Sequence, residues 1–343
     1  MESCRRITRL WQPKPRPDGV PGNDRPSQSR RCRPTVGAVD NKSEVREFLA
    51  SRRAKITPER AGLPSFGGKR RVPGLRREEV ALLSGVSVDY YTRLERGNLG
   101  GVSESVLESL AQALQLDDAE RSHLFDLARA ANAGAVSRGR RRASPRRVRP
   151  GLQRILDAIT DAPADVRNAR RDLLASNRLG HALYSELFDD PVRPANIARF
   201  TFLNPRARTF FTEWEKSAND LVANLRTEAG RNPYDRELSD LVGELSTRSD
   251  EFASRWAAHN VRQHNTGIKR LHHRIAGDLE LFYEVLELPG DPGLSLAIYT
   301  AEPGSPSQEA LRFLSSWATT NDSLPPRDMA PRSADLTSPD VTE

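Results

Sequence analysis

Two short apolar patterns separated by a glycine-containing break stand out in the N-terminal half of the chain. In Arg76–Ser84, the side chains of Val80, Ala81 and Leu83 recur at helical spacing and predict one buried helix face. Gly85 follows this pattern and suits a helix end, where the backbone turns left-handed without a Cβ penalty. The first pattern therefore predicts a short helix that stops abruptly.

The second pattern begins at Ser87, which is a good N-cap for another helix. Tyr91 and Leu94 are three residues apart and can face inward beside Val86. Two helices that cross at a short turn form the helix-turn-helix unit, and its second helix fits the major groove of DNA. The positions left on or near the outer face are Val88, Asp89, Tyr90, Thr92, Arg93 and Arg96. The alternative is a helical hairpin in an unrelated bundle.

Three further helices are predicted around this unit. They are Glu44–Ile56, with Val45, Phe48 and Leu49 on one stripe, then Ser103–Leu114 and Asp117–Ala130, which open on a serine and an aspartate cap. Five helices predict an all-α domain over residues 43–130. The helix order, the Ala81–Gly85–Val86 turn and the closing Leu94–Gly97 resemble the lambda-repressor-like, Xre-type DNA-binding domain.

Contacts to double-stranded DNA can be assigned from this pattern. In the recognition helix, opened by Ser87, we expect the residues at base edges to be Val88, Asp89, Tyr90 and Arg93. Phosphate contacts are expected from Lys69, Arg70, Arg71, Arg77 and Arg96. Because one small unit reads few base pairs, we also expect a homodimer on a pseudo-palindromic operator.

Charge is segregated along the chain. Residues 131–150 hold seven arginines and no acid, residues 43–130 carry a net charge of +1, and residues 151–343 carry −7. Within residues 43–130, basic side chains crowd in front of the first helix of the pair, while acids gather in Glu104–Asp126. This polarity suits a domain with one face toward phosphates. Residues 131–150 are interpreted as a solvated basic linker that can also follow phosphates.

The two ends of the chain show no apolar period, so residues 1–42 and 321–343 are expected to be disordered. Residues 1–42 also lack the apolar stretch of a signal peptide, and one interpretation is a gene start placed too far upstream, the protein beginning near Val39–Glu44. Cys4 and Cys32 both lie there, which leaves no cysteine for a disulfide or zinc site in the folded part. No run approaches eighteen apolar residues, so a soluble, cytoplasmic protein is expected.

Residues 151–320 change from helical to strand periodicity along their length. The predicted helices are Leu152–Thr160, Asn177–Leu187, Pro205–Ala229, Asp235–Leu245, Ser249–Ala258 and Ser307–Trp317. The predicted strands are Asp165–Asn168, Asp172–Ser176, Ile268–Arg274, Asp278–Leu286 and Ser295–Thr300. Two early strands, a helical insert and three further strands predict a five-stranded sheet with helices against it. This α+β layout is that of a PAS-like sensor domain.

Four segments carry a more specific resemblance. They read RRVPGLRREEVALLSGVSVDYYTRLERG, LDDAERSHLFDLA, FTEWEKSANDLVANLRTEAGRNP and LAIYTAEPGSPSQEALRFLSSW. They resemble the MmyB-like transcriptional regulators from about Val45 to Trp317. The resemblance implies an Xre-type helix-turn-helix followed by a PAS-like ligand-binding domain, with a small apolar ligand that is a fatty acid in some members. This chain departs from the family at Ser176, where a Trp is usual, and at His273-Arg274, where His-Pro is usual.

Candidate ligand-binding residues lie on the aromatic helices and on the first of the three later strands. They are Phe210, Trp214, Phe252 and Trp256, with Lys269 and Arg270 near the pocket mouth to meet a carboxylate. Plain core packing is the alternative for each aromatic side chain. A closed pocket bounded by Phe210–Trp214 and the Ile268–Thr300 strands would indicate a sensor. An exposed apolar patch would instead indicate a protein-interaction module without a ligand.

Catalysis and metal binding are not expected. His259, His264, His272 and His273 are the tempting cluster, but His272 and His273 would face opposite sides of a strand, and a metal needs converging ligands. HExxH, GxSxG and Gly-rich phosphate-loop motifs do not occur in the sequence. The sequence therefore predicts a DNA-binding regulator without a cofactor and without a catalytic residue.

Overall fold

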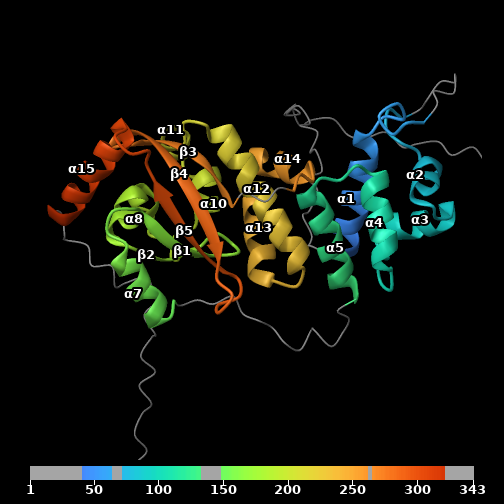
Figure 1. Cartoon of the computed structure of the whole chain (residues 1–343), viewed down its shortest axis with the longest axis horizontal. Coiled ribbons are helices and arrows are strands. Elements are labelled where there is room, and N and C mark those ends of the chain that lie inside the picture. Colours follow the sequence, from blue (N-terminus) through green and yellow to red (C-terminus); the bar gives the residue numbers. More distant parts are fainter. Residues whose placement is uncertain (1–40, 64–71, 133–147, 262–264, 321–343) are drawn as a thin grey trace, which may run out of the picture. The chain divides into compact units, whose positions relative to one another are not determined.

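Local capping signals delimit the helices of the N-terminal half. The computed structural model describes residues 41–63, 72–132, 148–261 and 265–320. Its first five helices are α1 (Asn41–Lys55), α2 (Arg77–Ser84), α3 (Val88–Glu95), α4 (Glu104–Ala113) and α5 (Asp118–Asn132). The predicted order of helices is confirmed (Figure 1).

The α2–α3 turn has the conformation that its sequence predicts. Gly85 ends α2 with φ at 68°, a left-handed value that favours glycine. Ser87 then caps α3, because its side-chain oxygen accepts a hydrogen bond from the backbone nitrogen of Tyr90 at 3.1 Å. Ser103 caps α4 in the same way. These caps hold the two helices at a short turn.

The N-terminal helices share one apolar core. Phe48, Leu49, Tyr91 and Leu94 are fully buried in it, with side chains from all five helices around them. One expectation is wrong, because Leu83 is exposed and Ser84 takes the inward position. The Ser84 hydroxyl remains satisfied there, since it donates to the carbonyl of Val80 at 2.7 Å.

A five-stranded sheet forms the framework of the C-terminal half, and the α+β fold class is confirmed. Its strands are β1 (Ala164–Asn168), β2 (Leu173–Ser176), β3 (Thr266–His273), β4 (Gly277–Glu287) and β5 (Leu294–Thr300). They pair in the order β2-β1-β5-β4-β3, each antiparallel to its neighbour. The two early strands thus join the three late ones through β5, which pairs with β1.

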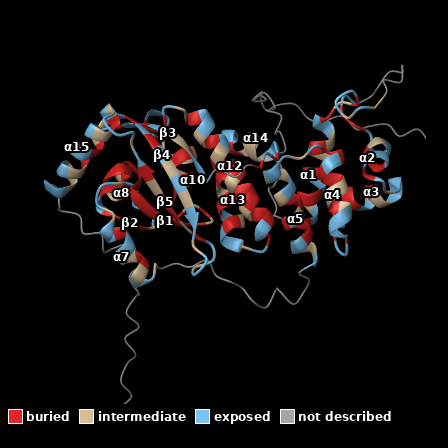
Figure 2. Ribbon diagram, viewed as in Figure 1, coloured by how far each residue is buried: buried red, intermediate tan, exposed pale blue. Residues whose placement is uncertain are grey.

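Helices cover the sheet and supply most of the surrounding core. They are α7 (Pro150–Ala158), α8 (Arg178–Leu183), α9 (Ser185–Phe188), α10 (Ile197–Leu203), α11 (Ala207–Phe210), α12 (Trp214–Arg231), α13 (Arg236–Arg248), α14 (Asp250–Ala257) and α15 (Pro306–Thr320). α15 packs against β4 and α8, while α7 packs on β1, β2 and β5 through Leu152 and Leu156. Figure 2 shows that β1 and β2 are mostly buried, whereas β3 and β4 have many exposed or half-buried positions.

The helical insert differs from its prediction in three places. The single helix expected over Asn177–Leu187 is divided at Tyr184 into α8 and α9. α10 was not predicted, and the continuous helix expected over Pro205–Ala229 is instead broken between α11 and α12. The break has a tertiary cause, because Phe211 forms a β-bridge with Leu271 of β3, and the Thr212 nitrogen donates to the carbonyl of Arg270. The backbone groups of Phe211 and Thr212 that pair with β3 cannot also form the hydrogen bonds of a continuous helix. The break brings Phe211 and Glu213 to the sheet.

All the described residues belong to one compact unit of the chain. Within it, α5 of the N-terminal half packs along α12 of the C-terminal half. Among the helices in the described ranges, none is long and apolar enough to cross a membrane.

Candidate DNA-contacting surface and ligand pocket

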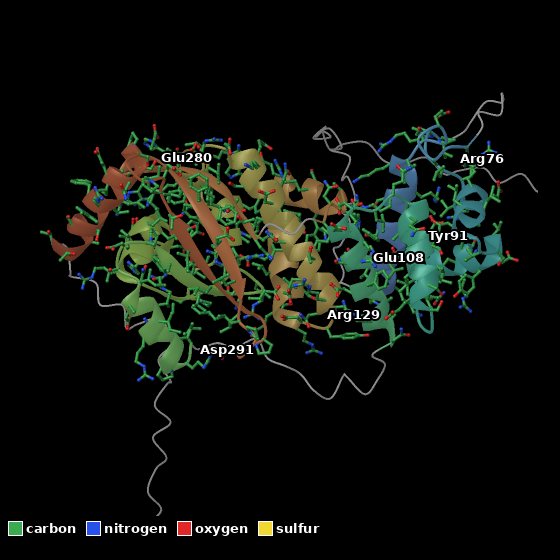
Figure 3. All side chains as sticks on the ribbon, in the orientation of Figure 1. Arg76, Tyr91, Glu108, Arg129, Glu280 and Asp291 are labelled. Atoms are coloured by element: carbon green, nitrogen blue, oxygen red, sulfur yellow. The ribbon has the colours of Figure 1, made fainter. Side chains whose placement is uncertain are left out.

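The outer face of α3 is polar and accessible. Val88, Asp89, Arg93 and Arg96 are exposed, while Tyr91 and Leu94 on the opposite face are fully buried. Tyr90 is half-buried, and the Arg93 guanidinium lies 5.0 Å from its ring centroid. Figure 3 labels Arg76, immediately before α2, and Tyr91 on α3. The residues expected at base edges therefore share one exposed surface.

A buried carboxylate fixes the base of this surface. Glu95 is buried, and its Oε1 accepts from Arg53 of α1 at 2.7 Å while its Oε2 accepts from Arg77 of α2 at 2.6 Å. Ion pairs thus connect α3 to α1 and to α2. Arg77, expected to contact phosphate, remains half-exposed beside this pair. The roles of Glu95 and Arg53 were not predicted, because neither follows an apolar period.

Four of the residues expected to contact DNA are not part of this exposed surface as described. Ser87 is exposed, but its hydroxyl oxygen is engaged as the cap of α3. Lys69, Arg70 and Arg71 lie outside the described residues.

A pocket of about 60 Å³ lies in the C-terminal half, between α12 and strands β3 to β5. Its lining comes from α10, the α11–α12 break, α12, the sheet and the turn after β1. The inward-facing residues include Arg167, Arg171, Phe211, Asp220, Lys269, Tyr283 and Tyr299. Because the α11–α12 break supplies Phe211, the pocket depends on the contact that interrupts the helix.

Positive charge dominates the inner wall of the pocket. Arg167 is paired with Asp165 through two hydrogen bonds of 2.7 and 2.6 Å, and it also donates to the Tyr299 hydroxyl. Arg171 and Lys269 lack such a partner among the described residues; the Lys269 ammonium lies 5.5 Å from the ring centroid of Phe211. Partial burial, together with Arg167, lowers the pKa of Lys269 to about 8.

The mouth of the pocket is ionic. Arg270 donates to Glu213 of the α11–α12 break and to Glu280 of β4, each at 2.7 Å, and Lys216 lies 3.5 Å from the second oxygen of Glu213. Arg270 and Glu280 stand opposite each other in the β3–β4 register, and Figure 3 labels Glu280. The mouth is therefore charged and exposed to solvent.

The predicted ligand-binding residues divide into two groups. Lys269 and Arg270 line the pocket, whereas Phe210, Trp214, Phe252 and Trp256 do not. Phe210, Trp214 and Phe252 are buried in the core, where Phe252 stacks on the half-buried Trp256 and the Trp214 indole donates to the Thr201 carbonyl. A helical period locates buried aromatic side chains but does not show which of them faces a cavity. Ser176 ends β2 and does not line the pocket either.

An ion cluster joins the C-terminal half to the N-terminal helices. The fully buried Arg226 of α12 donates to both oxygens of Glu44 in α1, at 2.5 and 2.6 Å. His123 of α5 lies 3.6 Å from the same carboxylate, and His259 Nδ1 lies 2.9 Å from Arg226. Burial would raise the pKa of Glu44, but Arg226 and the two histidines hold it well below its ordinary value.

One helix connects this cluster with the pocket. α12 lines the pocket through Lys216, Ser217, Asp220, Leu221 and Asn224, and it carries Arg226 immediately afterwards. Gly230, near its end, allows the close approach of His123. A displacement of α12 at the pocket would therefore move the partners of α1 and α5.

The histidines do not form a metal site in the described part of the chain, where no cluster of three or more His, Cys, Asp or Glu side chains could hold a metal. His272 is exposed and pairs with Asp278 at 2.6 Å, while His273 is buried. His264 lies outside the described residues.

Comparisons with known proteins agree with this division of the chain. Residues 148–314 match the MmyB-like transcription regulator ligand-binding domain. Residues 45–124 match a helix-turn-helix domain. A search of curated proteins found no match.

Proposed function

Because the chain belongs to the MmyB-like helix-turn-helix transcription regulators, we propose that a small molecule in its C-terminal pocket controls how tightly α3 binds an operator. The observation that carries this proposal is the continuity of α12. The same helix lines the pocket with Asp220 and reaches the DNA-binding half with Arg226.

The operator contacts follow from the exposed face of α3. Val88, Asp89, Tyr90 and Arg93 are the proposed base-reading residues, and an arginine in this position suits the O6 and N7 acceptors of guanine. Arg77, Arg96 and Lys69–Arg71 are the proposed phosphate contacts, which position the helix without reading sequence. Ser87 contributes by capping the helix.

Ligand control requires that the ligand prefer one arrangement of α12 over another. A ligand that binds both arrangements equally tightly does not shift the equilibrium between them, whatever its affinity. Since the coupling is reciprocal, operator DNA must change ligand affinity by the same factor that the ligand changes operator affinity. The charged pocket favours this sensing function over the alternative of a protein-interaction module without a ligand.

The ligand expected from the family resemblance is a small apolar molecule such as a fatty acid. Phe211, Tyr283 and Tyr299 supply aromatic surface for such a molecule, and Lys269 supplies a charge for its carboxylate. We further propose that the active form is a homodimer on two half-sites, because one recognition helix reads few base pairs.

The test of DNA recognition uses fluorescence anisotropy with the upstream region of the gene and a scrambled duplex. Arg93→Ala should weaken specific binding by about 1–3 kcal/mol and leave the scrambled duplex unaffected. Arg71→Ala should weaken both duplexes alike and lower the salt dependence. Arg248→Ala, an exposed arginine on α13, is the matched control. Unchanged binding by both Arg93→Ala and Arg71→Ala would refute the assignment of this surface.

A further inference from the structure

The inner wall of the pocket holds two cations, Arg171 and Lys269, without a direct ion pair to a described residue. Arg171 follows β1 in a left-handed conformation with φ at 69°, and its buried Nε has no hydrogen-bond partner. The Lys269 ammonium faces the rings of Phe211 and Tyr283, at 5.5 and 5.6 Å from their centroids. Among the described residues, neither side chain has a carboxylate oxygen within 4.0 Å. Both cations line the same small cavity.

The nearby acids are paired elsewhere or act on these two cations without a direct ion pair. Asp165 is committed to Arg167, which it binds through both carboxylate oxygens. Asp220 lines the pocket and its charge acts on Lys269, and the charge of Glu228 acts on Arg171, but neither acid forms a direct ion pair with these two cations. Loss of surrounding water and the neighbouring Arg167 lower the pKa of Arg171 to about 10, as they lower that of Lys269. A bound anion would reverse this destabilisation of the charged forms.

We propose that the pocket binds a short-chain carboxylate whose negative group lies between Lys269 and Arg171. This inference rests on the proposed sensing function, and it names the class of ligand. The arginine fork can hold a carboxylate through two parallel hydrogen bonds, and the lysine adds a compact charge. A monoanion is repelled less by Asp220, which also lines the pocket, than a dianion such as phosphate is.

The size of the pocket restricts the body of the ligand. The pocket has a volume of about 60 Å³. An engineered apolar cavity that binds benzene in another protein has a volume of ~150 Å³, more than twice as large. A long acyl chain would have to leave through the mouth, past the ion pairs of Glu213, Lys216 and Arg270. The part of the chain that leaves through the mouth would stay in contact with water, so it would contribute no hydrophobic stabilisation. The pocket therefore favours a short acid over a long-chain fatty acid.

Isothermal titration calorimetry on the full chain can test this inference. The probes are acetate, propionate and butyrate, their neutral amides acetamide, propionamide and butyramide, inorganic phosphate, and myristate. At least one short acid should bind at least tenfold more tightly than its amide and more tightly than phosphate or myristate. Lys269→Met should reduce that affinity at least tenfold, as should Arg171→Asn, a residue that tolerates the left-handed backbone. Lys42→Met, an exposed lysine on α1, should change it less than twofold.

Each outcome bears on the inference separately from the proposed function. Amides that bind as well as acids, variants with unchanged affinity, or no binding by any short acid would overturn it. Tight binding of myristate alone, with a change in operator affinity, would overturn the short-acid class while leaving the sensing function intact. Thermal melting distinguishes lost binding from lost folding, because Lys269→Met removes a partly desolvated charge and should not lower the Tm.

Discussion

Arg226 is the largest fully buried side chain of the described residues, and its neutralisation depends on Glu44 from the other half of the chain. The guanidinium also lies over the ring of Trp256, at 4.1 Å from the centroid. A buried pair of this kind is costly to break, because removing one partner leaves the other charge without compensation. At the residue scale, this buried pair joins the two halves of the protein together with further polar contacts, such as those of Arg231 with Asp126 and of Arg52 with the carbonyl of His259.

Replacing either partner should be more damaging than replacing both. Arg226→Met and Glu44→Leu should each lower the free energy of unfolding by about 3–5 kcal/mol. The double variant should lose much less than the sum, since it leaves no unpaired charge. Urea unfolding of the four proteins gives the coupling energy, with Arg248→Met as a control for removing an exposed arginine. Strictly additive losses would show that the pair is not coupled.

The same pair predicts an acid-dependent loss of stability. The pKa of Glu44 in the folded protein lies well below its ordinary value of 4.5, so the folded state favours the ionised carboxylate. Its contribution to stability is complete above pH 4.5 and is lost as the pH falls through the folded pKa. The Glu44→Leu/Arg226→Met double variant should lack this component. The free energies of unfolding of the unaltered protein and of the double variant, measured at several pH values between 7 and 3, should differ most at neutral pH and approach each other in acid.

At the scale of elements, the α5–α12 contact depends on a glycine. A Cβ at Gly230 would lie 2.7 Å from Nδ1 of His123, which is fully buried and cannot move aside. Gly243 on α13 has no such neighbour within 4 Å. Two helical glycines in adjacent helices therefore differ only in what surrounds them.

Alanine at these two glycines should have opposite effects. Gly230→Ala should destabilise the protein by about 1–3 kcal/mol through overpacking and weaken the effect of ligand on operator affinity. Gly243→Ala should stabilise it by up to about 1 kcal/mol, because alanine favours a helix. Thermal melting and anisotropy with and without ligand measure both effects. Equal melting temperatures for the two variants would contradict the close packing of α12 on His123.

At the scale of the whole molecule, recognition of an operator calls for two copies of α3. We expect two protomers per operator, related by a two-fold axis, with half-sites one helical turn of DNA apart. Sedimentation equilibrium with the operator duplex would give the stoichiometry, and a duplex with a single half-site would serve as the control. One protomer bound to the complete operator would rule out the dimer.

Local signals in the sequence determined the helix-turn-helix unit and most of the sheet. Gly85 and Ser87 define the α2–α3 turn by backbone conformation and capping, which need no distant partner. The strand periods likewise located β3, β4 and β5 to within two residues of their ends. These features were predictable because the residues that cause them are neighbours in the chain.

Tertiary structure alone decided where the pocket lies and how the halves are joined. The predicted helix over Pro205–Ala229 breaks because Phe211 pairs with Leu271 of β3, a partner distant in sequence. The same pairing selects Phe211 for the pocket and leaves Phe210 in the core. Arg226 and Glu44, 182 positions apart, carry no shared sequence pattern. Such features depend on which surfaces meet after the elements have formed, and hydrophobic periodicity specifies only that a surface is buried.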